Sequence, residues 1–596
     1  MKITFQSGEG GFSSFSSLQN PGVQTIFRQS FMQMFQTRTY RLRISGAVLL
    51  WLVSLTGAAQ GAFTSSNLPI IMIETGGYDI PYDNPRLVAD MGVIDNGPGL
   101  RNSITDTFNN YNGKISIEIH GQSSAGWSKK SYSFETQNPD GTNNNVRLLG
   151  FPPENDWILY APYYDRSFLR NVLTFHLTRQ MGWYASRTRY CELVLNGDYR
   201  GIYVLMEKIK RDSNRVDIAK LTNRDISGDD VTGGYILKVD KDDWKPGIDS
   251  EYPPYSGASQ TIRYQYVYPK ADKLLPQQEY YIKNFIGAFE FTVNSENFND
   301  PVSGYPKYLN IPSFADNFII NELSRNVDGY RLSSYFYKDK DSKGGKLTAG
   351  PVWDYNFSFG NVGYYNSQYT EGWQLEYFLN DDGFKNDDGF QLPFWWRKLL
   401  YDSAFVQKII DRWQALRTQV ITNENIVQFI DAVADTLDEA KNRNFQIWPG
   451  PGEPKLPEDG WFPPMDPIAD LHTYADEINY LETWISSRID WIDQNIGLLL
   501  NTAKPPPQTY GFFLGQNLPN PVVYETTIRY QIPSHLHVTL NIYNIFGEKV
   551  AILVDAFQER GEYFVNWKPV DVANGVYIYE IRAGDFRLTR KLLLQK

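Results

Sequence analysis

A run of three prolines, Lys504-Pro-Pro-Pro-Gln508, separates two parts of the chain that must fold independently. Proline lacks the backbone N–H that helices and sheets use, and consecutive prolines favour an extended, semi-rigid conformation. The 596 residues are also too many for a single hydrophobic core. We therefore predict a large domain over 63–500, a linker over 501–509 and a small domain over 510–596, after an N-terminal extension over 1–62.

The N-terminal extension contains a pattern typical of an export signal. Basic residues at Arg38, Arg41 and Arg43 precede an apolar segment at 44–55, and small residues follow over 56–62. The apolar segment is shorter than the ~20 residues of a membrane-spanning helix, so it indicates a cleaved secretory signal peptide. We expect a mature protein that lies outside the cytoplasm and keeps no stable transmembrane segment.

The large domain is predicted to be α+β. Two predicted hairpins flank one helix near its start: strands 114–120 and 131–136, then a helix that Asp165 caps, that runs through Met181 and that Gly182 ends, then strands 189–195 and 200–206. Further predicted helices cover 277–291, 311–323, 397–418, 423–444 and 468–495. The order strand, helix, strand, strand is that of the amino-terminal lobe of a protein kinase, and many other α+β folds share it.

The small domain is predicted to be all β. Segments with alternating apolar and polar residues predict strands at 526–532, 537–543, 563–567, 575–582 and 587–594. Short strands at this spacing are typical of a small, immunoglobulin-like β-sandwich.

Composition limits the partners of the protein. The formal net charge of −11 argues against nucleic-acid binding, which relies on Lys and Arg to neutralise phosphates. The 15% aromatic content suits either a surface that faces sugar or phosphate, or ordinary core packing. The single cysteine, Cys191, excludes an intramolecular disulfide, and its apolar neighbours favour a buried strand residue over a catalytic thiol.

Two acidic residues in apolar and aromatic surroundings are the strongest sign of chemistry. They are Asp328 and the Asp354 that ends Gly350-Pro-Val-Trp-Asp354. A kinase-type site needs one carboxylate to orient or deprotonate a hydroxyl group, and a second to hold Mg²⁺ against phosphate oxygens. A glycosidase also uses two carboxyl groups, but the paired Lys129 and Lys130 beside a Gly/Ser turn favour phosphate.

A short tandem repeat, Asn380-Asp-Asp-Gly-Phe384 and Asn386-Asp-Asp-Gly-Phe390, is a second acidic feature. A calcium-binding loop would place its oxygen ligands on alternate positions, and here the acids are adjacent. The repeat is either a Ca²⁺ site or a solvated acidic loop, and the spacing favours the loop.

Several phrases within residues 68–498 resemble the CotH kinase family, named for spore coat protein H. They follow the family order: His120-Gly-Gln-Ser-Ser124, Lys129-Lys-Ser-Tyr132, Tyr164-Asp-Arg-Ser-Phe-Leu-Arg-Asn171, Leu195-Asn-Gly-Asp-Tyr-Arg-Gly-Ile-Tyr203, Glu207-Lys-Ile-Lys210, Gly233-Gly-Tyr-Ile236, Asn326-Val-Asp328, Lys346-Leu-Thr-Ala-Gly-Pro-Val-Trp-Asp354 and Phe359-Gly-Asn361. The resemblance implies an atypical, bilobal protein kinase. Such an enzyme would use ATP with Mg²⁺ or Mn²⁺ to phosphorylate Ser in secreted or coat proteins.

The resemblance assigns roles to the acidic residues. Asp328 matches the family's catalytic acid, which orients the acceptor hydroxyl, and Asp354 matches the metal-binding acid. Asn356 stands where members usually carry a second acid, and its amide oxygen can still ligate Mg²⁺. His120 stands where many members carry Arg. These two departures support an alternative, a weak or inactive kinase-fold surface protein with a binding or structural role.

The resemblance also implies a set of nucleotide-binding residues. Lys129 or Lys130 would contact phosphate, and Glu207 and Lys208 would lie near the nucleotide cleft. Tyr203 is a candidate to stack on adenine, with a buried strand position as the alternative.

The small domain resembles the type IX secretion sorting domain (type A) of Bacteroidetes-like bacteria. The matching phrases are Leu514-Gly-Gln-Asn-Leu-Pro-Asn-Pro521, Thr527-Ile-Arg-Tyr530, Ile542-Tyr-Asn-Ile-Phe-Gly-Glu-Lys-Val550, Gly575-Val-Tyr-Ile-Tyr-Glu580 and Thr589-Arg-Lys-Leu-Leu-Leu594. This resemblance implies export through the type IX machinery to the cell surface or the medium. A generic β-sandwich adhesion module is the alternative.

Overall fold

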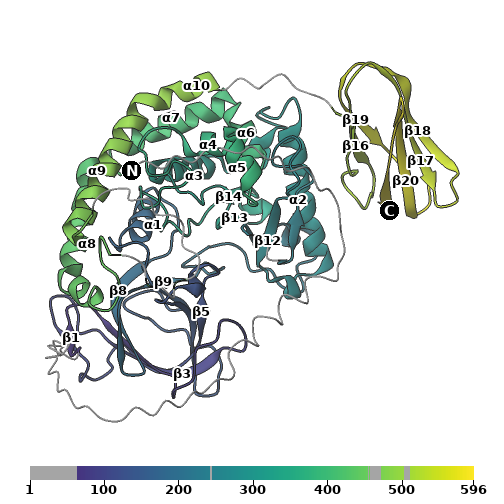
Figure 1. The fold of residues 1–596 in the computed structure, drawn as a ribbon. Helices are drawn as coiled ribbons and strands as arrows, with labels where there is room; N and C mark the ends of the chain where they lie inside the picture. Colours follow the sequence, from purple (N-terminus) through teal and green to yellow (C-terminus); the bar gives the residue numbers. More distant parts are fainter. Residues whose placement is uncertain (1–62, 242–243, 454–455, 457–458, 460–470, 503–510) are drawn as a thin grey trace, which may run out of the picture. The chain divides into compact units, whose positions relative to one another are not determined.

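The computed structural model describes residues 63–241, 244–453, 456, 459, 471–502 and 511–596 (Figure 1). The predicted signal peptide and the extension before it lie outside these residues. Helices and strands both contribute to the first and larger part, and the C-terminal part is all β.

Seven strands close into a barrel at the start of the described chain (Figure 1). Around the barrel they are β2 (Ile70–Glu74), β3 (Leu87–Ile94), β5 (Tyr111–His120), β6 (Ser131–Gln137), β7 (Asp156–Tyr160), β9 (Asp198–Glu207) and β8 (Thr188–Leu195). Neighbouring strands are antiparallel, except that β2 and β8 pair in parallel and close the ring. The two predicted hairpins are confirmed as β5–β6 and β8–β9, and the closure into a barrel is a feature that strand patterns do not reveal.

Alternate residues of these strands fill the barrel, as the period of two in a β-strand requires. Ile115, Ile117, Phe134, Leu193 and Leu205 are all completely buried in one cluster. A short pair of strands, β1 (Ser65–Ser66) and β4 (Asn102–Ser103), lies outside the barrel sheet.

Helix α1 (Arg170–Gln180) follows the barrel strand β7, and eight of its eleven residues are buried. Asp165 supports the start of α1 as predicted, because its carboxylate accepts a hydrogen bond from the Arg170 backbone N–H at 2.7 Å, although the helix itself begins only at Arg170. Gly182, at φ 98°, follows the helix as predicted, because a left-handed residue ends a helix most readily when it is glycine.

A second sheet of five antiparallel strands follows. Its order is β11 (Gly247–Asp249), β12 (Arg263–Tyr268), β10 (Tyr235–Val239), β13 (Ser334–Lys338) and β14 (Leu347–Ala349). The remaining helices are α2 (Pro276–Asn294), α3 (Ile311–Ser324), α4 (Gln374–Asn380), α5 (Asp382–Asp387), α6 (Trp395–Leu400), α7 (Ser403–Arg417), α8 (Asn423–Asn444), α9 (Tyr474–Asn495) and α10 (Leu499–Thr502).

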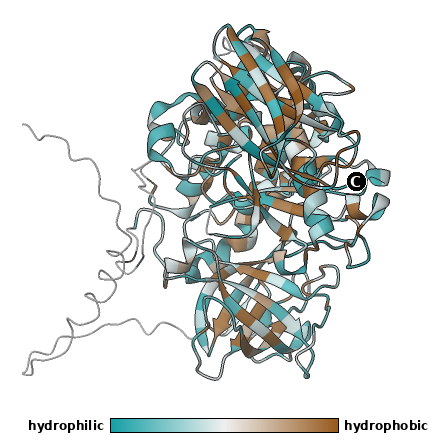
Figure 2. Cartoon of the chain, turned by 90° about the vertical axis from the view of Figure 1, so that its right-hand side faces the viewer, coloured by the Kyte–Doolittle hydropathy of each residue, from teal (hydrophilic) through white to brown (hydrophobic). Residues whose placement is uncertain are grey.

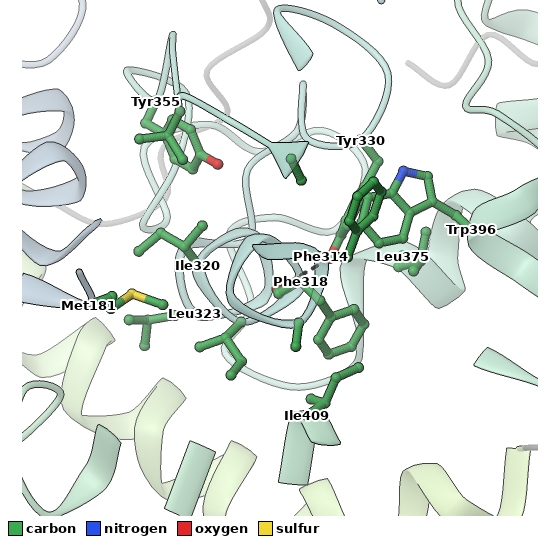
Figure 3. Packing of buried hydrophobic residues seen from close by; sticks show 14 of the residues in the cluster. Met181, Phe314, Phe318, Ile320, Leu323, Tyr330, Tyr355, Leu375, Trp396 and Ile409 are labelled. Atoms are coloured by element: carbon green, nitrogen blue, oxygen red, sulfur yellow. Dashed lines mark hydrogen bonds between the residues drawn. The ribbon is translucent and has the colours of Figure 1, made fainter. Parts of the chain in front are cut away.

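Helix α3 is the centre of the largest hydrophobic core, and eleven of its fourteen residues are buried. Figure 3 shows side chains from several other elements packed around this helix, among them Met181, Tyr330, Trp396 and Ile409. Burial of this much apolar surface holds α3 firmly, so the residues that follow its C-terminal end start from a fixed position.

Two predicted helices differ from the structure at their ends. The segment 397–418 is divided between α6 and α7, because the Asp402 carboxylate caps α7 by accepting from the Ala404 N–H at 3.0 Å. The segment 468–495 becomes helical only at Tyr474, where Thr473 and Asp476 form a capping box. Among the residues with described positions, none of the helices is both long and apolar enough to cross a membrane.

The C-terminal part consists of two antiparallel sheets. One contains β15 (Phe513–Leu514), β16 (Thr526–Ile532) and β19 (Gly561–Trp567); the other contains β18 (Lys549–Gln558), β17 (Leu536–Asn544), β20 (Gly575–Ala583) and β21 (Phe586–Leu594). Residues of both sheets share one core, including Ile528, Leu540 and Tyr579, and hydrophobic and hydrophilic residues alternate along the strands (Figure 2). The predicted all-β fold is confirmed, with β15 and β18 as strands that the sequence analysis missed.

Candidate functional site

Asp328 lies in a tight turn directly after α3. Arg325 ends the helix in the left-handed conformation, with φ 45°, and the Asn326 side chain accepts a hydrogen bond from the Asp328 N–H at 3.1 Å. Gly329 has no room for a side chain, since an added Cβ would lie 2.5 Å from the Asn321 Oδ1 atom. The turn is therefore fixed by local contacts, and it carries Asp328 at a constant place beside the core.

Asp354 lies in a loop after β14 and adopts φ 66°, the left-handed region that L-residues rarely occupy. The next residue, Tyr355, is held from two sides. Its N–H donates to Asn171 Oδ1 at 2.6 Å, and its hydroxyl donates to Asn321 Oδ1 at 2.9 Å. Such backbone strain persists when the surroundings over-determine a conformation, and it is concentrated at functional sites.

The two acids influence each other's ionisation. Burial, followed by the negative charges of Asp328 and Asp240, raises the pKa of Asp354 to about 7. Burial also raises the pKa of Asp328, against the opposing charges of Arg331 and Lys241. The structure thus brings the two predicted acids together in one partly buried region, and 17% of the Asp328 side chain is exposed.

A third acid, Asp240, joins the pair from the end of β10, and sequence reasoning missed it. Its carboxylate accepts from Lys238 Nζ at 2.6 Å, while Lys241 Nζ donates to the Ser123 hydroxyl at 2.8 Å. Ser123 belongs to the Gly/Ser turn between β5 and β6, so this contact links the turn to the acids. The signal in the sequence was the alternation of opposite charges in Lys238-Val-Asp240-Lys241 after a buried strand.

Lys208 and His120 extend this charged region at the barrel. Burial, followed by the charges of Lys208, Lys238 and Arg86, lowers the pKa of His120 to about 4, so the imidazole is neutral near pH 7. Burial also lowers the pKa of Lys208, although Asp156 opposes the shift. The charges of Lys208 and Lys238 therefore act on the same imidazole, that of His120.

Three residues of the predicted nucleotide-binding set are engaged inside the protein. Lys129 is 1% exposed, and its ammonium donates to the Ile202 carbonyl and to Asn444 Oδ1, both at 2.7 Å. Tyr203, also 1% exposed, packs in the barrel core and donates its hydroxyl to the Lys130 carbonyl at 2.9 Å. Because these groups are buried and already bonded, we assign both residues structural roles.

Glu207 is likewise buried and bonded. Its carboxylate accepts from the Arg187 guanidinium at 2.8 Å and from the Arg187 N–H at 3.0 Å, and it lies 3.8 Å from Arg215. We therefore assign it to the ion-pair network that anchors the end of β9. Lys130 differs from Lys129: it is half-buried and donates to the Ala125 carbonyl of the Gly/Ser turn at 2.8 Å.

Asn356 is buried two residues after Asp354, and its backbone carbonyl accepts from the Asn361 side chain at 2.7 Å. Within the described part of the chain, the Asn356 amide group makes no side-chain hydrogen bond of its own. Its oxygen is therefore not committed elsewhere, which suits the predicted role as a neutral metal ligand.

The donor set around Asp354 fits a magnesium-type ion that is shared with a phosphate ligand. Among the described residues, no three His, Cys, Asp or Glu side chains surround a single metal position. Mg²⁺ commonly binds through only one or two carboxylates and completes its shell with phosphate oxygens and water. Asp354 with Asn356 offers one carboxylate and one amide oxygen for such an ion. Burial, followed by the charges of Asp328 and Asp240, raises the pKa of Asp354, and a bound cation would favour its charged form.

The acids of the tandem repeat do not form a calcium site. Asp381 caps α5 by accepting from the Phe384 N–H at 2.7 Å, and Asp382 pairs with Lys385 at 3.0 Å. Asp388 binds Arg331 instead, and it also accepts a hydrogen bond from the Tyr365 hydroxyl. The second repeat is exposed at Asn386, Asp387, Gly389 and Phe390, as expected of a solvated acidic loop, and only its Asp388 faces the protein.

Two family models match the chain. The model described as CotH kinase protein matches residues 117–492, and the model described as Secretion system C-terminal sorting domain matches residues 518–595. The first match spans more than half of the chain and covers Asp328 and Asp354. No curated protein matches the chain.

Proposed function

The chain belongs to the CotH kinase family and carries a secretion system C-terminal sorting domain, and from this premise we propose that it is an exported atypical protein kinase. The sorting domain indicates secretion or a cell-surface location. The proposed reaction transfers the γ-phosphoryl group of ATP to Ser, or another hydroxyl residue, of surface or secreted proteins.

The observation that carries this proposal is that Asp328 and Asp354 lie close together and that lysine side chains act on the same site. A site that contained carboxylates alone would not need these lysines. Phosphoryl transfer needs positioning and charge compensation more than covalent chemistry from the protein. Lys238 and Lys241 supply positive charge at Asp354, and Lys208 and Lys238 supply it at His120, as the pKa effects on these two residues reflect. A glycosidase pair has no need of such cations.

In the proposed mechanism, Asp328 orients the acceptor hydroxyl and accepts its proton as the oxygen attacks the γ-phosphorus. The bond from the γ-phosphorus to the bridging oxygen breaks, and ADP leaves with that oxygen. Asp354 and Asn356 would hold Mg²⁺ or Mn²⁺, which supplies charge neutralisation at the phosphate oxygens when bound. We propose that the Gly/Ser turn, whose Ser123 hydroxyl accepts a hydrogen bond from Lys241, covers the phosphates.

The test is transfer of labelled γ-phosphate by the purified full chain, with Mg²⁺ or Mn²⁺ and a Ser-rich peptide or the protein itself as acceptor. Asp328→Asn should lower kcat by about 10²–10⁴-fold and keep nucleotide binding, since it removes only the proton acceptor. Asp354→Asn should abolish transfer and weaken metal-dependent ATP binding. Asp90→Asn, an exposed carboxylate whose ion pair is with Lys114, is the matched control and should behave as wild type.

A second function is favoured by Asn356 and by the neutral His120, which together reduce the charge available for metal and phosphate. Under this alternative the protein binds nucleotide or another ligand at the surface without turnover. Calorimetric ATP binding without any transfer would favour it, and absence of both binding and transfer would contradict the kinase proposal.

For the C-terminal domain, we propose the type IX secretion machinery as the partner. Deletion of residues 511–596 in a bacterium that has this machinery should retain the protein in the periplasm, as measured by cell fractionation. Normal delivery of the truncated chain to the cell surface would contradict the proposed role of this domain in export.

A further inference from the structure

We propose that Arg331 and Asp388 position the carboxylate of Asp328, so that the second Asn-Asp-Asp-Gly-Phe repeat supports the site. This inference rests on the proposed function, because it assigns how the proton acceptor of that reaction is held. Arg331 and Asp388 are positioning residues here, and neither is expected to touch the substrate.

Arg331 is a buried cation between two carboxylates, with only 3% of its side chain exposed. Its Nη1 atom donates to both oxygens of Asp388, each at 3.2 Å, and to the Phe390 carbonyl at 3.1 Å. Its Nε and Nη2 atoms donate to the Val327 carbonyl at 3.1 and 2.9 Å. The guanidinium is planar and rigid, so these bonds fix both its place and its orientation.

Aromatic rings close off the remaining directions. The guanidinium carbon lies 5.4 Å from the ring centroid of Tyr365, 5.5 Å from that of Phe378 and 5.4 Å from that of Phe384. Each ring face attracts the cation, and the attraction is stronger where water is excluded. Arg331 cannot leave this cage without losing its hydrogen bonds and its aromatic contacts together.

The contact of Arg331 with Asp328 is the longest that it makes to a carboxylate. Nη2 lies 3.5 Å from Asp328 Oδ1, whereas both bonds to Asp388 are 3.2 Å. At 3.5 Å the Coulomb attraction remains while the hydrogen bond is weak. Asp388 therefore takes the strong bonds of Arg331 and leaves the oxygens of Asp328 available to a hydroxyl group.

Asp388 is itself held in place. Its side chain is 10% exposed; it accepts from the Phe390 N–H at 2.7 Å and from the Tyr365 hydroxyl. Within the described ranges, loss of its charge would leave Asp328 as the only carboxylate paired with the buried Arg331 guanidinium. We expect Arg331 then to form a short ion pair with Asp328 and to occupy the oxygen that must accept the proton.

The first repeat supplies a matched comparison within the same chain. Asp382 occupies the repeat position that corresponds to Asp388, yet its side chain is 89% exposed and pairs with Lys385. The same five residues thus have different surroundings in the two copies. Asp382→Asn removes the same charge from the same sequence context and leaves Arg331 unaffected.

The experiment compares Asp388→Asn with Asp382→Asn in the full chain, using the phosphate-transfer assay. We expect Asp388→Asn to lower kcat by on the order of tenfold or more, as loss of a supporting partner commonly does, with KM for ATP changed less than about twofold. Asp382→Asn should leave both parameters unchanged. Tyr365→Phe keeps the ring and removes one bond to Asp388, so we expect a smaller fall in kcat.

A wild-type kcat in both Asp388→Asn and Tyr365→Phe would overturn the inference, and so would a rise in KM with kcat unchanged. If Asp388→Asn does not fold, the Tyr365→Phe result decides. If the wild-type chain transfers no phosphate, the proposed function fails. The present inference is then tested separately by a double-mutant cycle, in which Tm is measured for Asp328→Asn, for Asp388→Asn and for the double variant. A combined Tm loss that exceeds the sum of the single losses supports the coupling, and additive losses overturn it.

Discussion

Asn171 and Tyr355 connect helix α1 to the loop that carries Asp354. The Asn171 side chain is buried, and its Oδ1 atom accepts a hydrogen bond from the Tyr355 N–H at 2.6 Å, across 184 positions of the chain. The neighbouring Arg170 reaches the same loop, since its Nε donates to the Ser358 carbonyl at 3.1 Å. The start of α1 therefore anchors Tyr355, the residue directly after Asp354, and Asp354 is the residue in the left-handed conformation.

Substitution of Asn171 tests this connection. Asn171→Ala leaves the buried Tyr355 N–H without its partner, which costs about 1–3 kcal/mol, and it releases the strained backbone at Asp354. We expect a lower Tm together with a lower kcat for phosphate transfer, and weaker Mn²⁺ binding by calorimetry. A lower Tm with unchanged Mn²⁺ binding would show that Asn171 serves stability alone.

The ionisation of Asp354 predicts how stability depends on pH. Its pKa is raised from 3.8 to about 7, so between these values the folded protein binds a proton that the unfolded chain has released. Stability from this group is present at low pH and is lost as pH rises through the folded pKa. In EDTA, we expect Tm to fall from about pH 4 to about pH 7, and Asp354→Asn to flatten that fall.

Glu290 is a second buried acid that should contribute to the same fall of Tm with rising pH, and it serves as the comparison for Asp354. Burial raises the pKa of Glu290 to about 7 as well, although Tyr264 and Ser250 donate hydrogen bonds to it. Each of Asp354→Asn and Glu290→Gln should therefore remove part of the slope in a differential scanning calorimetry series. A full wild-type slope in Asp354→Asn would contradict the assigned pKa.

Asn356 sets the charge of the proposed metal site. Asn356→Asp adds the carboxylate that Asn356 lacks, and cation affinity rises with the number of charged ligands. We expect Mn²⁺ affinity in the presence of nucleotide to increase on the order of tenfold, measured by calorimetric titration. Asn366→Asp adds the same charge at an exposed position of the same region and should change the affinity little. Equal effects in the two variants would remove Asn356 from the ligand set.

We predict that Lys129 has a structural role and that Lys208 has a role in nucleotide binding, and one substitution at each position tests this difference. Lys129→Met deletes the buried bonds to Ile202 and Asn444 and should cost about 1–3 kcal/mol of stability, with KM for ATP unchanged. Lys208→Met removes a half-buried charge near the barrel rim and should raise KM for ATP by about tenfold, or about 1.4 kcal/mol of binding free energy. A raised KM with unchanged Tm in Lys129→Met would reverse these assignments.

Local patterns predicted most elements of this fold. The alternation in 114–120 and 131–136 predicted β5 and β6, and the apolar surroundings of Cys191 predicted a buried strand residue, which is 0% exposed on β8. Patterns failed at the ends of elements, as at Asp402, where a carboxylate that also accepts from Tyr305 caps a new helix. The capping bond to Ala404 is local and Asp is a common N-cap residue, whereas the bond from Tyr305 exists only in the folded chain.

The candidate site was predicted in part. Asp328 and Asp354 stood out because acids are unusual among apolar and aromatic neighbours, and the structure brings both into one region. The paired lysines 129 and 130 could not be distinguished in the same way. Only the packing of α8 against β9 determines that Lys129 is buried on Asn444 while Lys130 supports the Gly/Ser turn.

The sequence by itself determined the periodic elements, the all-β C-terminal domain and the identity of the two acids, because these depend on neighbouring residues. The tertiary structure alone decided the closure of the barrel, the approach of Asp240 and Lys241 to the acids, and the different environments of Asp382 and Asp388. Each of these depends on contacts between residues far apart in the chain. Such contacts follow from how whole elements pack, and periodicity along a single segment carries no record of them.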